Sequence, residues 1–90
     1  GILKEIASTL KEMADIRVNI IGHTDSDGDD ASNLILSKKR ADAVKKMLVE
    51  EFGIDAKRLE TDGKGETQPI DKNTSPESKA NNRRVEFIKL

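Results

Sequence analysis

The sequence contains no cysteine, tryptophan or tyrosine, and aromatic residues make up only 2% of its 90 residues. The lack of cysteine excludes disulfide bonds and thiolate metal sites, although it does not settle the compartment. With so few aromatic side chains, the chain lacks the stacking surface that single-stranded nucleic acid needs. Its net charge of −1 provides no basic field either. We therefore expect no nucleic-acid partner.

Long hydrophobic runs are also missing. No apolar run approaches the roughly 20 residues of a membrane-spanning helix, so we do not expect the domain itself to insert into a membrane. Charged residues make up 37% of the chain, which indicates a small aliphatic core under a heavily charged surface. This length suits a single domain over residues 1–90. Because the chain begins with Gly1-Ile2-Leu3-Lys4, as if inside a helix, we expect an N-terminally truncated domain.

The apolar periodicity predicts two main helices and three strands. The expected ranges are about 2–14 and 30–52 for the helices, 17–22, 59–63 and 85–90 for the strands, and 66–82 for a polar loop with one short helical turn after Pro76. On the second helix we expect one apolar side, made of Leu36, Ala43 and Met47 with Val44 and Leu48 slightly turned. This order of elements predicts an α+β fold, a two-layer α/β sandwich with the helices on one face of a small mixed sheet.

An acidic stretch, GHTDSDGDD over residues 22–30, follows the first strand. A calcium loop counted from Asp25 would need Gly at its sixth position and Glu at its twelfth, where this chain has Asp30 and Leu36. A phosphatase nucleophile would need a lysine and further carboxylates on a longer chain. Most of these acids therefore fit a solvated turn that favours the next helix N-terminus, and Asp25, closest to the strand, is the candidate for a positioned side chain.

One stripe of the second helix carries an arginine. Asn33, Ser37, Arg40 and Val44 share this stripe, because seven residues turn a helix through nearly two whole turns. An arginine on a packing stripe has to find an acceptor. Two interpretations stay open: a structural ion pair between Arg40 and Asp25, or a clamp in which Asp25 binds the ammonium and Arg40 the carboxylate of one ligand.

Catalytic chemistry finds little support in the sequence. His23 is the single histidine, and there is neither a cysteine nor a nucleophile elbow. A lone imidazole near a strand end is more typical of a structural residue than of a proton-transfer group. We expect no enzyme activity, no catalytic residue, no metal site and no cofactor.

Four motifs occur in order along residues 17–90: GHTD, N-x-x-L-S-x-x-R-A-x-x-V from Asn33 to Val44, GKGE followed by Pro69, and ANNRRVE from Ala80 to Glu86. In these motifs the chain resembles the OmpA-like C-terminal domain family, which includes the peptidoglycan-associated lipoproteins and the flagellar stator anchor proteins. The resemblance implies a non-enzymatic domain that binds the diaminopimelate of the peptidoglycan peptide stem. It implies anchoring of the outer membrane or of an envelope complex to the cell wall, in the periplasm, as part of an outer-membrane-associated protein of a Gram-negative-type envelope.

The resemblance also implies the binding residues. The family's binding aspartate falls on Asp25 and its binding arginine on Arg40, and Asn33 helps to shape the site beside the arginine. The full expected set is Asp25, Arg40, Asn33, Thr24, Leu36 and Arg83. Leu36 is expected in the core or in the pocket wall. Of Arg83 and Arg84, one should face the ligand and the other solvent, because neighbours on a strand point in opposite directions, and Arg83 is the preferred one.

Two departures from the family pattern bear on the site. The family's first strand, which lies beside the C-terminal strand, is missing here, so we expect a pocket without one wall. We also expect an unpaired edge at 85–90 that invites a strand-mediated homodimer. Lys79 and Asn81 differ from common family residues, and we expect neither to touch the ion clamp.

The alternative function is a calcium-responsive envelope interaction or adhesion module that uses the acidic loop 25–30; a hydrolase is a further alternative.

Overall fold

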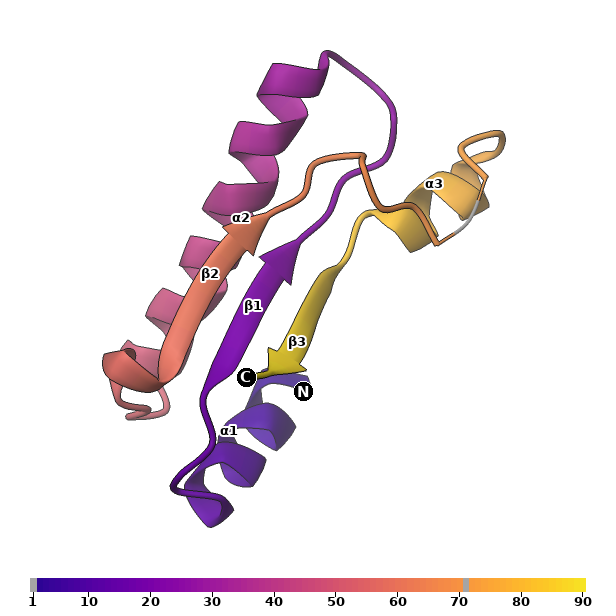
Figure 1. Ribbon diagram of the computed structural model, residues 1–90. Helices are drawn as coiled ribbons and strands as arrows, with labels where there is room; N and C mark the ends of the chain where they lie inside the picture. Colours follow the sequence, from indigo (N-terminus) through magenta and orange to yellow (C-terminus); the bar gives the residue numbers. More distant parts are fainter. Residues whose placement is uncertain (1, 71) are drawn as a thin grey trace.

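The computed structural model describes residues 2–70 and 72–90 and shows an elongated molecule of 40 × 22 × 22 Å (Figure 1). Its elements are α1 (Ile2–Glu12), β1 (Val18–Gly22), α2 (Asp30–Glu50), the 3-10 turn η1 (Ala56–Arg58), β2 (Leu59–Gly63), α3 (Pro76–Asn82) and β3 (Val85–Lys89). The expected order is confirmed, and the short helix after the loop begins at Pro76 as expected. The truncation expected at Gly1 lies outside the described residues and stays a prediction.

The three strands form one mixed sheet in the order β2-β1-β3. The central strand β1 runs parallel to β2 and antiparallel to β3. A parallel pair needs a crossover connection, and α2 supplies it between β1 and β2. The predicted α+β architecture with a small mixed sheet is confirmed.

Both long helices cover the same face of the sheet. Alternate residues of β1 are buried, and Ile20 pairs with Phe87 of β3 on that face. One cluster of buried apolar residues joins helices and sheet: Ala7 and Leu10 of α1, Ala41 and Leu48 of α2, Ile54, and Val18, Ile20 and Leu59 of the strands. The core therefore lies between the helices and one sheet face. None of the helices in the described part of the chain is both long enough and apolar enough to cross a membrane.

The buried side of α2 differs from the predicted one. Its buried residues are Asn33, Ser37, Ala41 and Leu48. Leu36 and Met47 are each 41% exposed and Ala43 is exposed, so their expected place on the packed side is wrong, as is the core alternative for Leu36.

The reason is a close approach between α2 and the ends of two strands. Gly22 and Gly63 pair in the β1–β2 register under Ser37. A Cβ atom on Gly63 would lie 2.5 Å from the backbone nitrogen of Lys38, and one on Gly22 would overlap the Ser37 carbonyl oxygen. Small side chains are thus required where helix and sheet touch, and the larger apolar residues of α2 turn outward.

Strand β3 forms one edge of this sheet. The bonds from Leu90 N to Arg17 O (2.9 Å) and from His23 N to Arg84 O (2.8 Å) set the alternation of the antiparallel ladder. The backbone groups of Val85, Phe87 and Lys89 therefore point away from β1. A groove of about 450 Å³ lies beside this edge and is lined by α1, Val18, Phe87 and Lys89. Among the described residues the expected open edge is present, and the homodimer stays a prediction.

Candidate ligand-binding site

Backbone bonds fix the loop that leaves β1. The N–H of His23 donates to Arg84 O, and the N–H of Thr24 donates to Gly65 O, both at 2.8 Å. These bonds attach the loop to the segments that follow β2 and precede β3. The Thr24 hydroxyl donates to the Asp25 carbonyl at 2.9 Å. As a result, Thr24 and Asp25 are both buried and are held by scaffold on two sides.

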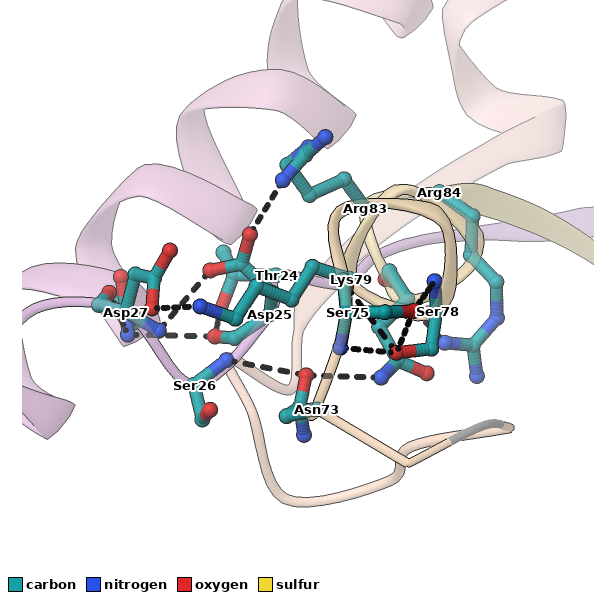
Figure 2. A network of polar contacts seen from close by, with 12 residues as sticks. Thr24, Asp25, Ser26, Asp27, Asn73, Ser75, Ser78, Lys79, Arg83 and Arg84 are labelled. Atoms are coloured by element: carbon teal, nitrogen blue, oxygen red, sulfur yellow. Dashed lines mark hydrogen bonds and ion pairs between the residues drawn. The ribbon is translucent and has the colours of Figure 1, made fainter.

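The Asp25 carboxylate accepts two hydrogen bonds (Figure 2). The N–H of Asp27 donates to Oδ1 at 2.9 Å, and Arg83 Nη1 donates to Oδ2 at 2.5 Å. The first bond, and then the Arg83 guanidinium, hold the pKa of Asp25 below its usual range although burial opposes this shift. Asp25 is thus a positioned, ionised carboxylate at the exit of β1.

Asn33 supports this loop from the first turns of α2. Its side-chain amide donates to the carbonyl of Asp27 at 2.9 Å and to that of Asp25 at 3.4 Å. The residue is only 6% exposed. The structure therefore places Asn33 against the loop that carries Asp25, and its expected role beside Arg40 stays a prediction.

Helix α3 brings two cations to two carboxylates. Lys79 Nζ lies 2.9 Å from Asp27 Oδ1, and Arg83, the residue that ends α3, reaches Asp25 (Figure 2). Lys79 therefore contacts neither Asp25 nor Arg40, as expected, although its partner Asp27 is two residues from Asp25. Asn73 joins the same network by accepting from Ser26 N at 3.3 Å.

Sequence reasoning missed Lys79 and Asn73 as members of this network. Both come from the segment between β2 and β3, where no periodic pattern exists. The capping signal at Ser75-Pro76, with a capping box completed by Ser78, was the one local indication that an ordered helix carries these groups.

The neighbouring arginines of the NRRV motif have different surroundings. Arg83 binds Asp25, whereas Arg84 Nε donates to Glu86 at 2.7 Å and Arg84 Nη2 donates to Gln68 O at 2.8 Å. Arg84 therefore joins the start of β3 to the segment that follows β2. Only Arg83 lies at the candidate site.

Arg40 lies half-buried in the middle of α2. Within residues 2–70 and 72–90 the structure gives its guanidinium no hydrogen bond and no ion pair. The structural pairing of Arg40 with Asp25, one of the two sequence interpretations, is therefore not present, because Arg83 occupies that carboxylate. Its N–H donors are therefore not used by the other described residues. Leu36, one turn earlier, is exposed and remains a predicted wall residue.

His23 is 1% exposed, and its Nε2 lies 3.3 Å from Glu86 Oε1. Burial lowers the pKa of His23, and the positive charge of Arg84 lowers it further. The imidazole is thus held neutral between β3 and the segment after β2, in agreement with a structural role.

Carboxylates of the acidic loop already bind other groups of the protein. Asp29 is the N-cap of α2, where its side chain accepts from the N–H groups of Ala31 and Ser32. Asp25 and Asp27 are paired with Arg83 and Lys79. In the described part of the chain, no three acidic or histidine side chains come together as a metal site would require.

A second cavity, of about 250 Å³, lies beside the loop and is lined by Asp30, Ala31, Leu34, Lys64, Gly65, Glu66 and Thr67. The Asp30 carboxyl, and then burial, raise the pKa of Glu66 there. Asp25 lines neither this cavity nor the groove beside β3.

Comparison with known proteins places this arrangement in context. The chain is 46% identical over 85 residues to the probable lipoprotein YiaD of Escherichia coli K12, covering 94% of this chain and 38% of that protein. It is 41% identical over 87 residues to the peptidoglycan-binding protein ArfA of Mycobacterium tuberculosis H37Rv, covering 97% of this chain and 26% of ArfA. The crystal structure of the peptidoglycan-associated lipoprotein from Burkholderia pseudomallei superposes with a TM-score of 0.90 at 31% identity, covering 98% and 74% of the two chains.

The chain thus spans well under half the length of these curated relatives. The sequence model described as the OmpA family matches residues 1–83. The fold and the order of the motifs agree with this match, and the chain belongs to the OmpA family.

Proposed function

We propose that this domain binds peptidoglycan non-covalently through the diaminopimelate of the peptide stem, as a binding module and not as an enzyme. The observation that carries the proposal is the pair of charges on neighbouring elements. Asp25 is an ionised carboxylate fixed at the exit of β1. Arg40 is a half-buried guanidinium on α2 to which the described residues supply no acceptor.

The charges suit one end of the proposed ligand. The free end of diaminopimelate carries an ammonium and a carboxylate on one carbon. Asp25 would bind the ammonium and Arg40 would bind the carboxylate in bidentate fashion. Thr24, Asn33 and Leu36 would shape the pocket around this end.

The same chemistry explains why a lysine-containing stem should bind less well. Lysine offers the ammonium without the adjacent carboxylate, so Arg40 would stay unpaired in the complex. Leaving a partly buried polar group unsatisfied costs about 1–3 kcal/mol, or roughly 5- to 150-fold in affinity. The proposed site therefore favours walls of the diaminopimelate type.

The relatives support this proposal through their names. One is described as peptidoglycan-binding and one structural neighbour as a peptidoglycan-associated lipoprotein. We infer that the domain works in the periplasm, where it would anchor the outer membrane or an envelope complex to the wall. One weak site would suffice, because a polymeric ligand and many tethered copies act together.

Co-sedimentation with purified diaminopimelate-type sacculi tests the proposal. We expect Asp25→Asn and Arg40→Gln each to reduce binding by at least about tenfold while circular dichroism stays unchanged. Asp15→Asn and Lys39→Gln, at exposed positions, are charge-matched controls that should bind like the wild type. Wild-type binding by both site variants would contradict the proposal.

The calcium-responsive alternative has its own test. A ligand that binds the folded state must raise the melting temperature. Because the loop carboxylates at 25, 27 and 29 are already used for ion pairs and for capping, we expect no shift on adding millimolar CaCl₂. A reproducible rise in melting temperature that Asp27→Asn abolishes would favour the alternative.

A further inference from the structure

We propose that Arg83 acts as a built-in competitor at Asp25 and thereby makes the site selective for zwitterionic over singly cationic ligands. This inference rests on the proposed function. It concerns how the site excludes ligands that present an ammonium alone.

Arg83 occupies the position that a ligand ammonium would need. Its Nη1 lies 2.5 Å from Asp25 Oδ2, whereas the other oxygen, Oδ1, accepts from the loop N–H of Asp27. An incoming ammonium therefore meets a carboxylate that already has a cationic partner (Figure 2).

The two members of this pair differ in solvent exposure. The Asp25 side chain is 9% exposed and belongs to a loop held by backbone bonds, whereas the Arg83 side chain is 43% exposed. Among the described residues, Asp25 is the sole hydrogen-bond partner of the Arg83 side chain. Exchange would therefore move the exposed arm of Arg83 and leave the loop in place.

Arg84 shows what a structural arginine looks like in the same motif. Its side chain is 16% exposed and donates to Glu86 and to the carbonyls of Asn82 and Gln68. Three acceptors hold its guanidinium, so moving it would break the bonds that join the start of β3 to the segment after β2. Arg83 has one partner at the surface, which is the arrangement expected of an exchangeable group.

The balance of charges then decides which ligand can displace Arg83. An ammonium alone replaces one cation by another at Asp25 and leaves the guanidinium without a partner. A zwitterionic end brings its own carboxylate, which can accept from the displaced Arg83 as well as from Arg40. Diaminopimelate therefore offers the displaced Arg83 a new acceptor, whereas lysine offers it none.

The test compares Arg83→Gln with Arg17→Gln. Arg17 forms a surface ion pair with Glu60 at 3.1 Å, and Glu60 lies on β2 at its end away from the site, so its replacement matches the charge change. We would measure dissociation constants for soluble muropeptides with a diaminopimelate stem and with a lysine stem, by calorimetry at one fixed ionic strength.

We expect Arg83→Gln to bind the lysine stem about 3- to 10-fold more tightly than the wild type does, so that the preference for diaminopimelate falls. Arg83→Lys, which keeps a cation on this arm, should retain most of the preference, and Arg17→Gln should retain all of it. A merely structural role for Arg83 would weaken binding of both stems equally.

An unchanged preference in Arg83→Gln, or equal weakening for both stems, would overturn this inference alone. If the wild type binds neither muropeptide, the proposed function fails as well. The wild-type measurement therefore distinguishes failure of this inference from failure of the proposed function.

Discussion

The two ends of the sheet are held together in different ways. At the end near α1, buried aliphatic residues such as Leu10, Val18 and Leu59 form the core. At the end near α3, carboxylates, guanidinium groups and backbone N–H groups hold the loop around Asp25. Burial of aliphatic groups does not depend on pH, whereas hydrogen-bonded carboxylates respond to pH and ion pairs are also screened by salt. The fold should thus depend on one end and the ligand site on the other.

The largest effect on stability should come from the apolar end. Ile20 is fully buried, and Ile20→Ala should lower the free energy of unfolding by about 2–5 kcal/mol. Ile88→Ala, on the uncovered face and 44% exposed, should change it by no more than about 0.5 kcal/mol. Urea unfolding measures both, and equal losses would contradict the placement of the core on one face.

The contact between α2 and the strands should be the next most sensitive place. Gly22→Ala would place a Cβ against the Ser37 carbonyl and should cost about 1–3 kcal/mol. Gly53, which follows α2 with φ +71° and has open space around it, provides the control. Gly53→Ala should cost only the backbone preference, about 1 kcal/mol, in the same unfolding assay.

At the polar end, Asp25→Asn should separate binding from folding. The paired Arg83 is exposed to solvent, so the loss in stability at pH 7 should be about 1 kcal/mol or less. The lowered pKa of Asp25 adds stability above its ordinary pKa, and this stability is lost as the pH falls through the folded-state value. The wild type should therefore lose more stability than the variant on acidification below about pH 4.

His23 should respond in a milder pH range. Because burial lowers its pKa in the folded state, the unfolded chain binds more protons below about pH 6.5, and stability falls as the pH drops from 7 toward 5. His23→Gln should flatten this part of the profile, measured by chemical denaturation at each pH. A profile that keeps its slope in the variant would assign the proton uptake to another group.

The smallest effect on stability should come from the open edge of β3, where the change is in association. Lys89→Pro removes a backbone donor that points away from β1, so the fold should survive and any strand-mediated homodimer should dissociate. Ile88→Pro, which removes a bond to β1, should instead destabilise the sheet. Light scattering after size-exclusion chromatography reports both, and a wild type that is monomeric at all concentrations would exclude the homodimer.

The sequence was informative wherever one pattern dominated. Apolar spacing with a period of 3.6 located the long helices, a β-branched run located β1, alternation located β3, and Gly53 marked the end of α2 as expected. The apolar pattern was misleading on the buried side of α2. The helix approaches Gly22 and Gly63 so closely that only small residues fit on its facing side, and large apolar residues do not. Apolar periodicity contains no information about how closely two elements approach.

The partners at the site were harder to predict for a different reason. Asp25 and Asn33 are close in sequence, and the Asn33 amide donates to the Asp25 carbonyl. Arg83 is 58 residues from Asp25, and the segment between β2 and β3 has no repeating pattern. Chemistry suggested that Asp25 needs a cation, but only the path of that segment decides that Arg83, and not Arg40, supplies it in the free domain.

Gly22 and Gly63, which lack Cβ atoms under Ser37, bear on the size of the ligand that the proposed site would accept. Asp25 is attached to the end of β1, and Arg40 belongs to α2, so the separation of their side chains depends on how deeply the helix rests on the strands. Two missing Cβ atoms set that depth. A methyl group at either glycine would lift the helix and widen the span between Asp25 and Arg40, so the proposed site would then suit a longer zwitterion than in the wild type.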